Sequence, residues 1–425
     1  MEPTPLALDD FDLSDVEFWQ RPMAEREGAF LALREQDPIR FYKEPLISEM
    51  FPPGPGYYAL TRHADVVEAS KSPALFCSGQ GTNIPDMPPE FLEFLGSIIN
   101  MDDPRHARLR RIVSRGFTPK QLDAMKGDVE QAAADILDEV VERGEGDFVT
   151  DIAAILPLRI IVDLMGIPRS HETFIFDRTN VILGLGDPEY VPDQTEAGIT
   201  AALLQAAQDL SLLITELGED RMKNPRDDLT TALVTAEVDG EMLTPGELAS
   251  FFLLLVVAGN ETTRNAIAHG LVALTEHPEQ RDRWMADFDA LAPTAVEEIV
   301  RWATPVIHFR RTVTQDGVRI GDKELNTGDK VVLWYASANR DAAVFDDPFR
   351  FDIGRTPNDH VGFGGPGPHF CLGAHLARRE ITVMFRELFR RVPDIRAVSE
   401  PDRLKSNFIN GIKHLQAEWT PAARS

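Results

Sequence analysis

The chain has 425 residues, and its 69 acidic and 43 basic side chains give a formal net charge of -26. An acidic balance of this size excludes nucleic acid and anionic membrane surfaces as general partners. Two cysteines cannot build a disulfide framework, the N-terminus has no signal-peptide pattern, and no apolar run reaches ~20 residues, so we expect a cytoplasmic protein without a membrane anchor.

The first hundred residues predict two helices and a strand. We expect residues 1–10 to be flexible, and apolar residues at helical spacing predict a helix over 18–34. A strand follows at Tyr57–Leu60, and a second helix at 64–71. Segment 77–101 is rich in Gly, Pro and Asn, which fits a lid over a pocket and ordinary core packing equally well. Its apolar patch comprises Phe91, Phe94, Leu95, Ile98 and Ile99.

The next segment is basic in an otherwise acidic chain. Residues 105–120 contain five arginines, a lysine and a histidine, and no acid. The preceding Pro104 suits a first helical turn, and His106 and Arg110 are four residues apart, so they share one helix face. A solvated basic helix is one interpretation, and a carboxylate-binding face is the other.

Residues 121–240 predict amphipathic helices, with Gly, Pro and Asp breaks at 144–147, 184–188 and 224–228. Thr244 and Glu247 then form a capping box, with Pro245 at the first helical position. The helix that they open extends to about residue 274 and is apolar almost all round at 251–258. Such a helix is buried through the middle of a protein.

A polar turn interrupts this buried helix. It reads Gly259-Asn260-Glu261-Thr262-Thr263. The glycine costs about 1 kcal/mol of helix propensity, and an acid and hydroxyls in a buried helix are also costly. These costs indicate either a functional site or a kink where Thr bonds the carbonyl four residues back.

Two further charged features follow. Glu298 and Arg301 are three residues apart on a predicted helix that Pro305 ends, and alone they would be a routine ion pair. Residues 308–313 predict a strand in which alternation turns only one of Arg310 and Arg311 inward. Short strands are expected at 318–320 and 330–335. A turn at 408–412 either reaches into a pocket or closes a plain hairpin.

The most specific stretch is Phe363-Gly-Gly-Pro-Gly-Pro-His-Phe-Cys371-Leu-Gly373. Its glycines and prolines exclude a helix or a central strand, and a helix-forming run begins directly after it. The loop therefore presents Cys371 at a helix N-terminus, where N–H groups favour a thiolate suited to haem iron.

Other roles for Cys371 fit less well. A buried structural cysteine is the usual fate of a lone Cys. Zinc would have only His369 and Cys371, one residue apart, which is poor zinc spacing. A phosphate-binding loop would need Lys-Ser/Thr after the glycines, and none follows.

The loop resembles the haem-binding signature of the cytochrome P450 superfamily. Phe363 stands eight residues before Cys371, one more than the superfamily usually has. That longer loop resembles an actinobacterial branch acting on lipids and sterol side chains, and the sequence is most similar to its methyl-branched lipid omega-hydroxylases. The resemblance covers about residues 15–419. It implies a mainly α fold, with about a dozen helices and small β-sheets around a buried haem b.

The resemblance also implies roles for individual residues. Glu261 and Thr262 would supply protons to bound O2, Gly259 would open a groove for it, and Glu298 and Arg301 would be structural. Haem would be bound by Cys371 at iron and by His106, Arg110, Ala258, Gly259, Arg311, Phe363, Gly364, Gly367, His369 and Gly373. The apolar pocket is expected to comprise Ile98, Leu254, Val257, Ala258, Val306 and Phe408.

The implied function is a haem-thiolate monooxygenase that hydroxylates the terminal carbon of methyl-branched lipids. Its electrons would come from a ferredoxin and its reductase, docked on the basic patch that includes Arg108 and Arg111. Sterol side-chain hydroxylation is the alternative. A peroxide-driven peroxygenase typically replaces the acid and alcohol pair, and a haem sensor would not need Glu261 and Thr262, so their presence disfavours both. We expect one domain over residues 1–425, because no linker or repeat divides the chain.

Overall fold

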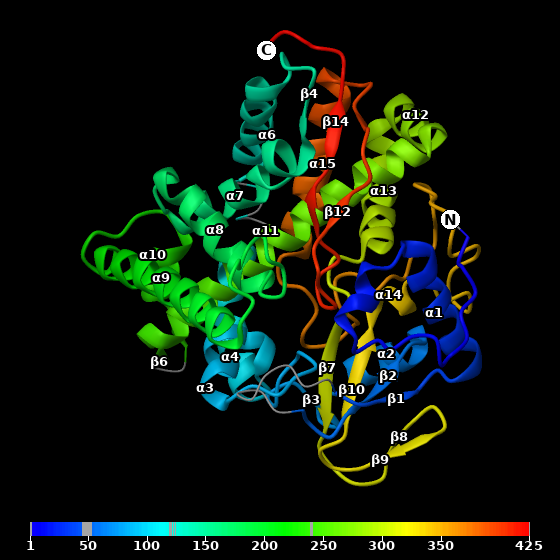
Figure 1. The fold of residues 1–425 in the computed structure, drawn as a ribbon. Coiled ribbons are helices and arrows are strands. Elements are labelled where there is room, and N and C mark those ends of the chain that lie inside the picture. Colours follow the sequence, from blue (N-terminus) through cyan, green and yellow to red (C-terminus); the bar gives the residue numbers. More distant parts are fainter. Residues whose placement is uncertain are drawn as a thin grey trace.

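A computed structural model describes residues 2–44, 53–118, 121, 123, 125–238 and 241–424. Long helices form one side of the molecule and the largest β-sheet lies at the other, with α11 running between them (Figure 1). The mainly helical fold with small sheets confirms the predicted class. The α-helices are α1 (Met23–Gln36), α2 (His63–Lys71), α3 (Pro89–Gly96), α4 (Arg105–Val113), α6 (Lys126–Val140), α7 (Ile155–Met165), α8 (Glu172–Leu183), α9 (Glu196–Lys223), α10 (Leu229–Val234), α11 (Pro245–Glu276), α12 (Pro278–Ala286), α13 (Phe288–Ala303), α14 (Tyr335–Ala338) and α15 (Ala374–Arg391).

The main sheet has the strand order β1-β2-β10-β7-β3, in which β10 is parallel to β2 and antiparallel to β7. A three-stranded sheet, β11-β14-β4, ties the C-terminal region to the helical side. The strands are β1 (Phe41–Tyr42), β2 (Tyr57–Leu60), β3 (Phe76–Cys77), β4 (Glu145–Asp147), β5 (Glu237–Val238), β6 (Glu241–Met242), β7 (His308–Val313), β8 (Val318–Ile320), β9 (Lys323–Leu325), β10 (Lys330–Trp334), β11 (Arg396–Ala397), β12 (Asp402–Arg403), β13 (Ile412–His414) and β14 (Gln416–Glu418).

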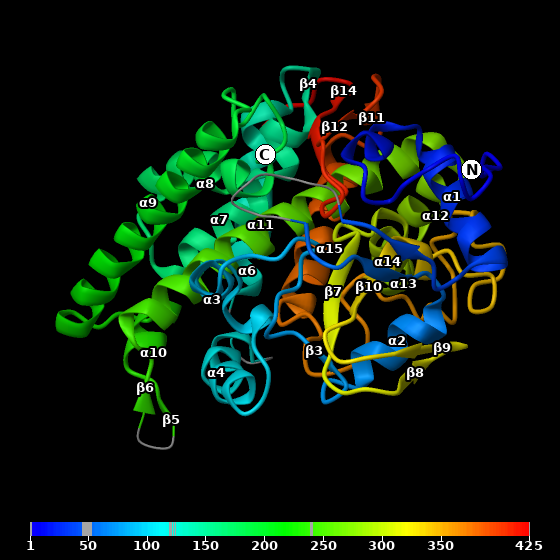
Figure 2. The ribbon, with the colours of Figure 1, turned by 60° about the horizontal axis from the view of Figure 1, so that its bottom comes forward.

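Helix α11 is the central element. The predicted capping box is present, since Thr244 Oγ1 accepts from the Glu247 N–H at 3.1 Å while the Glu247 carboxylate accepts from the Thr244 N–H at 3.0 Å. Most of the helix is buried, and it packs against α3, α7, α9, α13 and α15. Figure 2 shows α3 and α4 between this helical half and the sheet. The prediction of a helix buried through the middle of the protein is confirmed.

The N-terminal predictions need correction. The expected helix over 18–34 is divided, because Pro22 has no N–H and an extended ψ of 145°: a 3-10 turn at Val16–Gln20 precedes α1. Within residues 1–10, which we expect to be flexible, residues 4–8 contact the rest of the protein. The Thr4 N–H donates to the Ala24 carbonyl at 2.8 Å, and Leu6 and Leu8 pack against a buried aromatic cluster.

Other boundaries agree closely with the sequence. The predicted strands at 57–60, 308–313 and 318–320 are β2, β7 and β8. The expected strand over 330–335 ends one residue early, because Tyr335 begins α14. The three predicted breaks fall at β4 and in the loops that flank α9.

By length and composition alone, α9 could cross a membrane, with a mean hydropathy of 1.4 in its most apolar window. We expected no membrane-spanning helix because the chain has no uninterrupted apolar run of about 20 residues. Polar residues interrupt the apolar residues of α9, so that criterion did not identify this helix. A single helix of this kind is weak support for a membrane span, since soluble proteins also contain helices of this length and composition.

The Glu298–Arg301 pair lies at the centre of a buried hydrogen-bond network. Both side chains are 0% exposed, and the guanidinium donates to the carboxylate at 2.7 and 2.8 Å. Arg301 also donates to the Asn339 and Pro348 carbonyls at 2.8 and 3.0 Å, and Arg355 donates to Glu298 at 3.1 Å. The pair therefore fixes the irregular chain that leads from α14 toward the cysteine loop.

We predict that Arg301→Met lowers the free energy of unfolding by about 3–5 kcal/mol, because it leaves a buried carboxylate without its main partner. The measurement is denaturant unfolding of the purified protein. Arg390→Met is the matched control, since Arg390 pairs with Glu387 at 2.6 Å but is 57% exposed. The control should change stability by less than about 1 kcal/mol. Equal losses in the two variants would contradict the network's role.

Candidate active site

The cysteine loop is held by its own backbone and by α2. The Cys371 N–H donates to the Phe363 carbonyl at 2.9 Å, and Gly364 has a φ of +85°, a conformation that glycine adopts without steric cost. A side chain on Gly367 would lie 2.3 Å from the Ser70 carbonyl oxygen. Gly367 was predicted to bind the cofactor, but the structure places it against α2, where its lack of a side chain lets the backbones approach.

Cys371 lies at the N-terminus of α15 and borders a cavity, which accounts for the accessible surface of a residue deep in the protein. Burial raises the pKa of its thiol, while hydrogen bonds from the Gly373 and Ala374 N–H groups and the nearby Arg110 and Arg378 lower it. Burial is the larger effect. The helix N-terminus therefore favours the thiolate, as the sequence predicts, but its effect is smaller than that of burial.

The cavity above Cys371 has an empty volume of about 1420 Å³. One face of α11 forms a wall of it, and β7, the preceding residues 305–306 and the short turn at 97–100 contribute others. The predicted residues Ile98, Leu254, Ala258 and Val306 line it. Its walls are therefore largely apolar, with charged groups gathered at one end.

Two predicted pocket residues do not line this cavity. Val257 packs against the main core cluster, because its position on α11 lies outside the arc that carries Leu254 and Ala258. The ring of Phe408 contacts the ring of Phe309, with centroids 5.5 Å apart, and Phe309 lines the cavity in its place. The turn at 408–412 thus supports the wall of the cavity from behind.

The polar end of the cavity is lined by two arginines and a histidine, with a second histidine directly behind it. Arg110, Arg311 and His369 line it, and the ring of His106 lies 4.3 Å from that of His369. His106 is 2% exposed and its Nε2 has no hydrogen-bond partner. Burial, and then Arg311, His106 and Arg110, lower the pKa of His369 to about 2, so this imidazole is neutral.

The choice between Arg310 and Arg311 is decided by the strand. Arg311 lines the cavity and its Nη1 donates only to the Arg310 carbonyl, at 2.7 Å, among the contacts of the described residues. Burial lowers the pKa of its guanidinium. Arg310 points to the other face, where it pairs with Asp86 at 2.7 Å and donates to the Ile84 carbonyl at 3.2 Å.

The polar turn of α11 divides its side chains between two faces. Thr262, Ala258 and Gly259 line the cavity, and Thr262 Oγ1 donates to the Ala258 carbonyl at 2.7 Å. A Cβ on Gly259 would lie 2.6 Å from Ile161 Cδ1, so the glycine also allows α7 to pack closely. Thr262 therefore presents a hydroxyl to the cavity next to the space that the glycine leaves.

Glu261 points away from the cavity. Its carboxylate is 1% exposed, pairs with Arg264 and accepts from Asn265 Nδ2 at 3.0 Å. Arg264 in turn donates to Asn180 Oδ1 of α8 at 3.0 Å. Glu261 Oε2 has no partner. The acid is thus placed between the cavity-lining Thr262 and the start of the α8–α9 loop.

The sequence missed several cavity residues. Tyr335 lies near Arg311 in the lining of the cavity. The sequence predicted it only as the last residue of a strand, which gave no indication of a place in the cavity. Phe309 could have been found, since it lies two residues before Arg311 on the same face of β7. Glu380 of α15 also lines the cavity and accepts a hydrogen bond from Thr263. Burial raises the pKa of Glu380 to about 8, so it is largely protonated at neutral pH.

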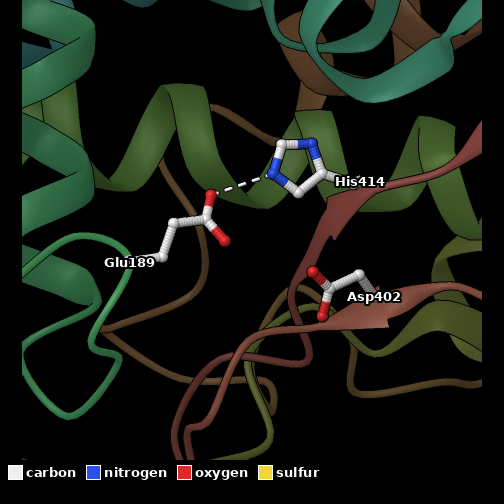
Figure 3. Close-up of side chains that lie close together, drawn as sticks. All are labelled: Glu189, Asp402 and His414. Carbon is white, nitrogen blue, oxygen red and sulfur yellow. Dashed lines mark hydrogen bonds and ion pairs between the residues drawn. The ribbon is translucent and has the colours of Figure 1, made fainter.

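The sequence predicted a helix-loop-helix at α8 and α9. The loop between these helices is attached to the C-terminal hairpin by ion pairs between side chains. Figure 3 shows Glu189 of this loop facing His414 of β13, with Asp402 of β12 beside them. His414 Nε2 lies 2.9 Å from Glu189, and Lys413 Nζ lies 2.9 Å from Glu189 and 3.2 Å from Asp187. Lys413 supplies the cation within this acidic group, which favours an ion network over a metal site.

The basic segment is only partly the open patch that the sequence predicted. Arg105 and Arg108 pair with Glu247 of α11 at 3.5 and 2.7 Å, and Arg105 also pairs with Glu93. Arg108 thus ties α4 to the start of α11, and reversing its charge would test folding as well as docking. Arg115 is exposed, and Phe370 of the cysteine loop is 38% exposed.

Known proteins explain this arrangement. The sequence model of the family described as cytochrome P450 matches residues 172–407. The chain belongs to the cytochrome P450 family. A methyl-branched lipid omega-hydroxylase of Mycobacterium tuberculosis is 51% identical over 422 residues, which cover 98% of this chain and 96% of that protein. A steroid C26-monooxygenase of Mycolicibacterium smegmatis is 39% identical over 428 residues, covering 100% and 97%.

Solved structures agree. A cytochrome P450 of Mycobacterium marinum in complex with pseudoionone has a TM-score of 0.91 and 40% identity, covering 98% of this chain and 100% of that one. A second, from Bacillus megaterium in complex with corticosterone, has a TM-score of 0.80 and 29% identity, covering 93% and 98%. The predictions of a P450 fold, a haem cofactor and a monooxygenase are confirmed.

The residues present fit a haem. The cavity has a thiol on one wall, and Arg110 and the buried Arg311 line its polar end, with the unpartnered His106 Nε2 next to it; these groups suit two carboxylates. A haem would bring two propionate carboxylates and an iron that a thiolate can bind. We expect Arg110, Arg311 and His106 to bind the propionate end and Cys371 the iron.

We predict that Arg311→Ala accelerates haem loss from this P450 by at least about tenfold, because a buried charge-assisted contact contributes about 1.5–3 kcal/mol. The measurement is the rate at which haem passes from the purified protein to excess apomyoglobin. Arg115→Ala is the control, since Arg115 is exposed on the neighbouring segment. Equal rates in the two variants would remove Arg311 from the haem site.

The ion network predicts a pH-dependent attachment of the α8–α9 loop. Burial lowers the pKa of His414, but hydrogen bonds to Asp147 and Glu189 outweigh it, so the net pKa is raised. A raised pKa means that the stabilisation is fully present below the unfolded value of about 6.5 and is lost as pH rises through the folded pKa. Amide exchange in residues 185–192, corrected for intrinsic rates, should therefore increase with pH.

His414→Gln should abolish this pH dependence. Lys413 stays charged across the range, because its hydrogen bonds to Glu189 and Asp187 outweigh burial and raise its pKa. An exchange rate that increases as pH falls would contradict the assignment.

Proposed function

We propose that this P450 hydroxylates the terminal carbon of methyl-branched lipids, such as branched fatty acids, branched alcohols and isoprenoids. The observation that carries the proposal is the 51% identity, over 98% of the chain, to a methyl-branched lipid omega-hydroxylase. The apolar walls of the cavity, which include Ile98, Leu254 and Val306, suit a lipid chain. These walls support a lipophilic substrate in general, and the sequence similarity supports the branched class.

The residues of this chain would divide the work. When bound, a haem with a cysteine thiolate ligand, the feature that defines the cytochromes P450, activates O2 for insertion of one oxygen atom into a C–H bond. Thr262 would form a hydrogen bond to O2 bound in the cavity, since its hydroxyl lies on the wall beside Gly259. Glu261 would carry protons inward from the α8 side, where its free Oε2 and Arg264 lie.

The remaining elements would bind and enclose the substrate. The turn at 97–100 places Ile98 and Ile99 on the cavity wall, so segment 77–101 would act as a lid as well as packing against the core. The α8–α9 loop, which does not line the cavity in this structure, would move over it when substrate binds, and Glu189 and its partners on the hairpin hold the loop in place. Closure would exclude water from the site.

We further propose that a ferredoxin and its reductase supply the electrons, as in bacterial relatives of this kind. The ferredoxin would dock near Arg115 and Phe370, which are exposed beside the cysteine loop. The chain would act as one domain in the cytoplasm, and nucleic acid would not be a partner, in keeping with the net charge of -26.

A sterol side chain is the second candidate substrate. Steroid C26-monooxygenases are 39% identical over nearly the whole chain, and a sterol side chain also ends in a methyl branch. A peroxygenase or a haem sensor is less consistent with the site, because Thr262 lies on the cavity wall with Glu261 beside it in the sequence.

The haem absorption spectrum distinguishes the substrates. We predict that a methyl-branched fatty acid shifts the ferric protein from low spin to high spin at lower concentration than a straight-chain acid of equal length. A cholesterol-type sterol is titrated in parallel. Tighter binding of the sterol would favour the second candidate, and no shift with any lipid would contradict both.

We predict that Thr262→Ala lowers product formed per electron pair consumed by at least about tenfold, because a proton donor at the reacting atoms contributes about 10²-fold or more. The measurement is the ratio of hydroxylated lipid to NAD(P)H oxidised in the reconstituted system. Thr275→Ala is the matched control, since Thr275 donates to the Leu271 carbonyl at 2.8 Å on the same helix but outside the cavity. An undiminished, peroxide-driven activity in Thr262→Ala would overturn the monooxygenase mechanism.

A further inference from the structure

A second, smaller cavity lies between α1, the end of α13 and the turn at 408–411. It has room for little more than one or two water-sized groups. Figure 1 shows α1 beside α14, and the two helices are in contact. The lining residues are Trp19, Met23, Arg26, Glu27, Phe30, Trp302, Ala303, Thr304, Ile307, Ala336, Arg340 and Asn410.

Arg26 is the unusual member of this lining. Its side chain is 5% exposed, and its Nε and Nη2 have no hydrogen-bond partner. Among the described residues, no carboxylate forms an ion pair with it. A guanidinium that is removed from water without a partner is strongly destabilising. The fold must therefore supply something that the side chains do not.

The neighbouring groups do not neutralise Arg26. Arg340 also lines the cavity, and it donates to the Arg301 and Trp302 carbonyls at 3.0 and 2.9 Å. The single carboxylate in the lining, Glu27, has one oxygen 3.8 Å from Arg340 Nε and another without a partner. Two cations therefore face one anion in the wall of the cavity.

Nearby positive charges also contribute to lowering the pKa values of two basic groups around the cavity. Burial, and then Arg403, lowers the pKa of Arg26 to about 9, although the neighbouring Glu27 carboxylate acts in the opposite direction. The pKa of the buried His269 is lowered to about 3 by burial and by Arg403, Arg26 and Arg340. Water could satisfy the free N–H groups, but it would leave this charge uncompensated.

We propose that this cavity binds a small monovalent anion of about the size of chloride, held by the Nε and Nη2 groups of Arg26 with the Nε–H of Arg340 beside it. Trp19, Phe30 and Trp302 contribute apolar rings to the lining, and the small space disfavours larger anions such as phosphate and sulfate.

The position of this site gives the anion a structural role near the haem cavity. Asn410 donates from Nδ2 to the Ala303 carbonyl at 2.6 Å and from its backbone N–H to the Pro305 carbonyl at 2.9 Å. Val306, which lines the haem cavity, pairs with Ile409. An anion between Arg26 and this turn would therefore join α1 to the wall of the active site.

The first test is thermal unfolding of the haem-loaded protein at constant ionic strength, with chloride replacing gluconate, which is too large for the cavity. We expect a saturable rise in Tm of about 2 °C between zero and 0.15 M chloride. Arg26→Met should abolish the dependence, because it keeps the length of the side chain and removes its charge. Arg21→Met should retain it, since Arg21 is a half-buried cation just before the same helix. A Tm that is independent of chloride in the unmodified protein would overturn the proposal.

The second test is anomalous diffraction from crystals of the haem-loaded protein soaked in bromide, which needs no variant. A bromide peak within hydrogen-bond distance of Arg26 Nε and Nη2 is the expected result. A water molecule at that position, with no anomalous signal, would overturn the proposal even if Arg26→Met fails to fold. A bromide peak without any chloride dependence of Tm would identify an adventitious ion only, and would also overturn it.

Discussion

The structure depends on the burial of one long helix, α11. Its apolar surface drives it between the helical side of the molecule and the sheet, so a polar turn within it must find partners inside the core. Thr262 bonds the carbonyl four residues back, and Glu261 pairs with Arg264 on its own helix. The costs of burying these groups are thereby reduced, and the same turn brings a hydroxyl to the haem cavity with a carboxylate on the adjoining face.

Buried charge follows two patterns in this protein. Where the charge is structural, as at Glu298 and Arg301, the pair is fully satisfied by carboxylate, guanidinium and backbone carbonyls. Where a ligand belongs, the polar groups remain open, as at His106 Nε2 beside the haem cavity. Arg26 shows the second pattern, although it lies away from the haem cavity. Unsatisfied buried groups in a native fold generally mark a missing partner, because desolvation without hydrogen bonding is costly.

Much of the fold and the site could be predicted from local sequence. The capping box set the start of α11, and the glycines and prolines around Cys371 fixed a loop before α15. The predictions that were wrong also have local causes. Pro22 divides a helix that was predicted to be continuous. The arc of α11 that faces the cavity is narrower than the apolar composition of the helix suggested, so Val257 lies outside it. Phe408 was placed one layer too far inward, since no local pattern tells a pocket residue from one that supports it.

The sequence by itself determined the chemistry, because a cysteine in a Gly- and Pro-rich loop before a helix, and a Gly-acid-Thr turn in a buried helix, are local patterns with local physical causes. Only the tertiary structure decided which groups meet across the chain. Strand pairing turned Arg311 to the cavity and Arg310 away from it, helix packing joined Glu261 to α8 through Arg264, and three distant segments left Arg26 without a partner. Such contacts depend on residues tens to hundreds of positions apart, which periodicity and spacing cannot relate.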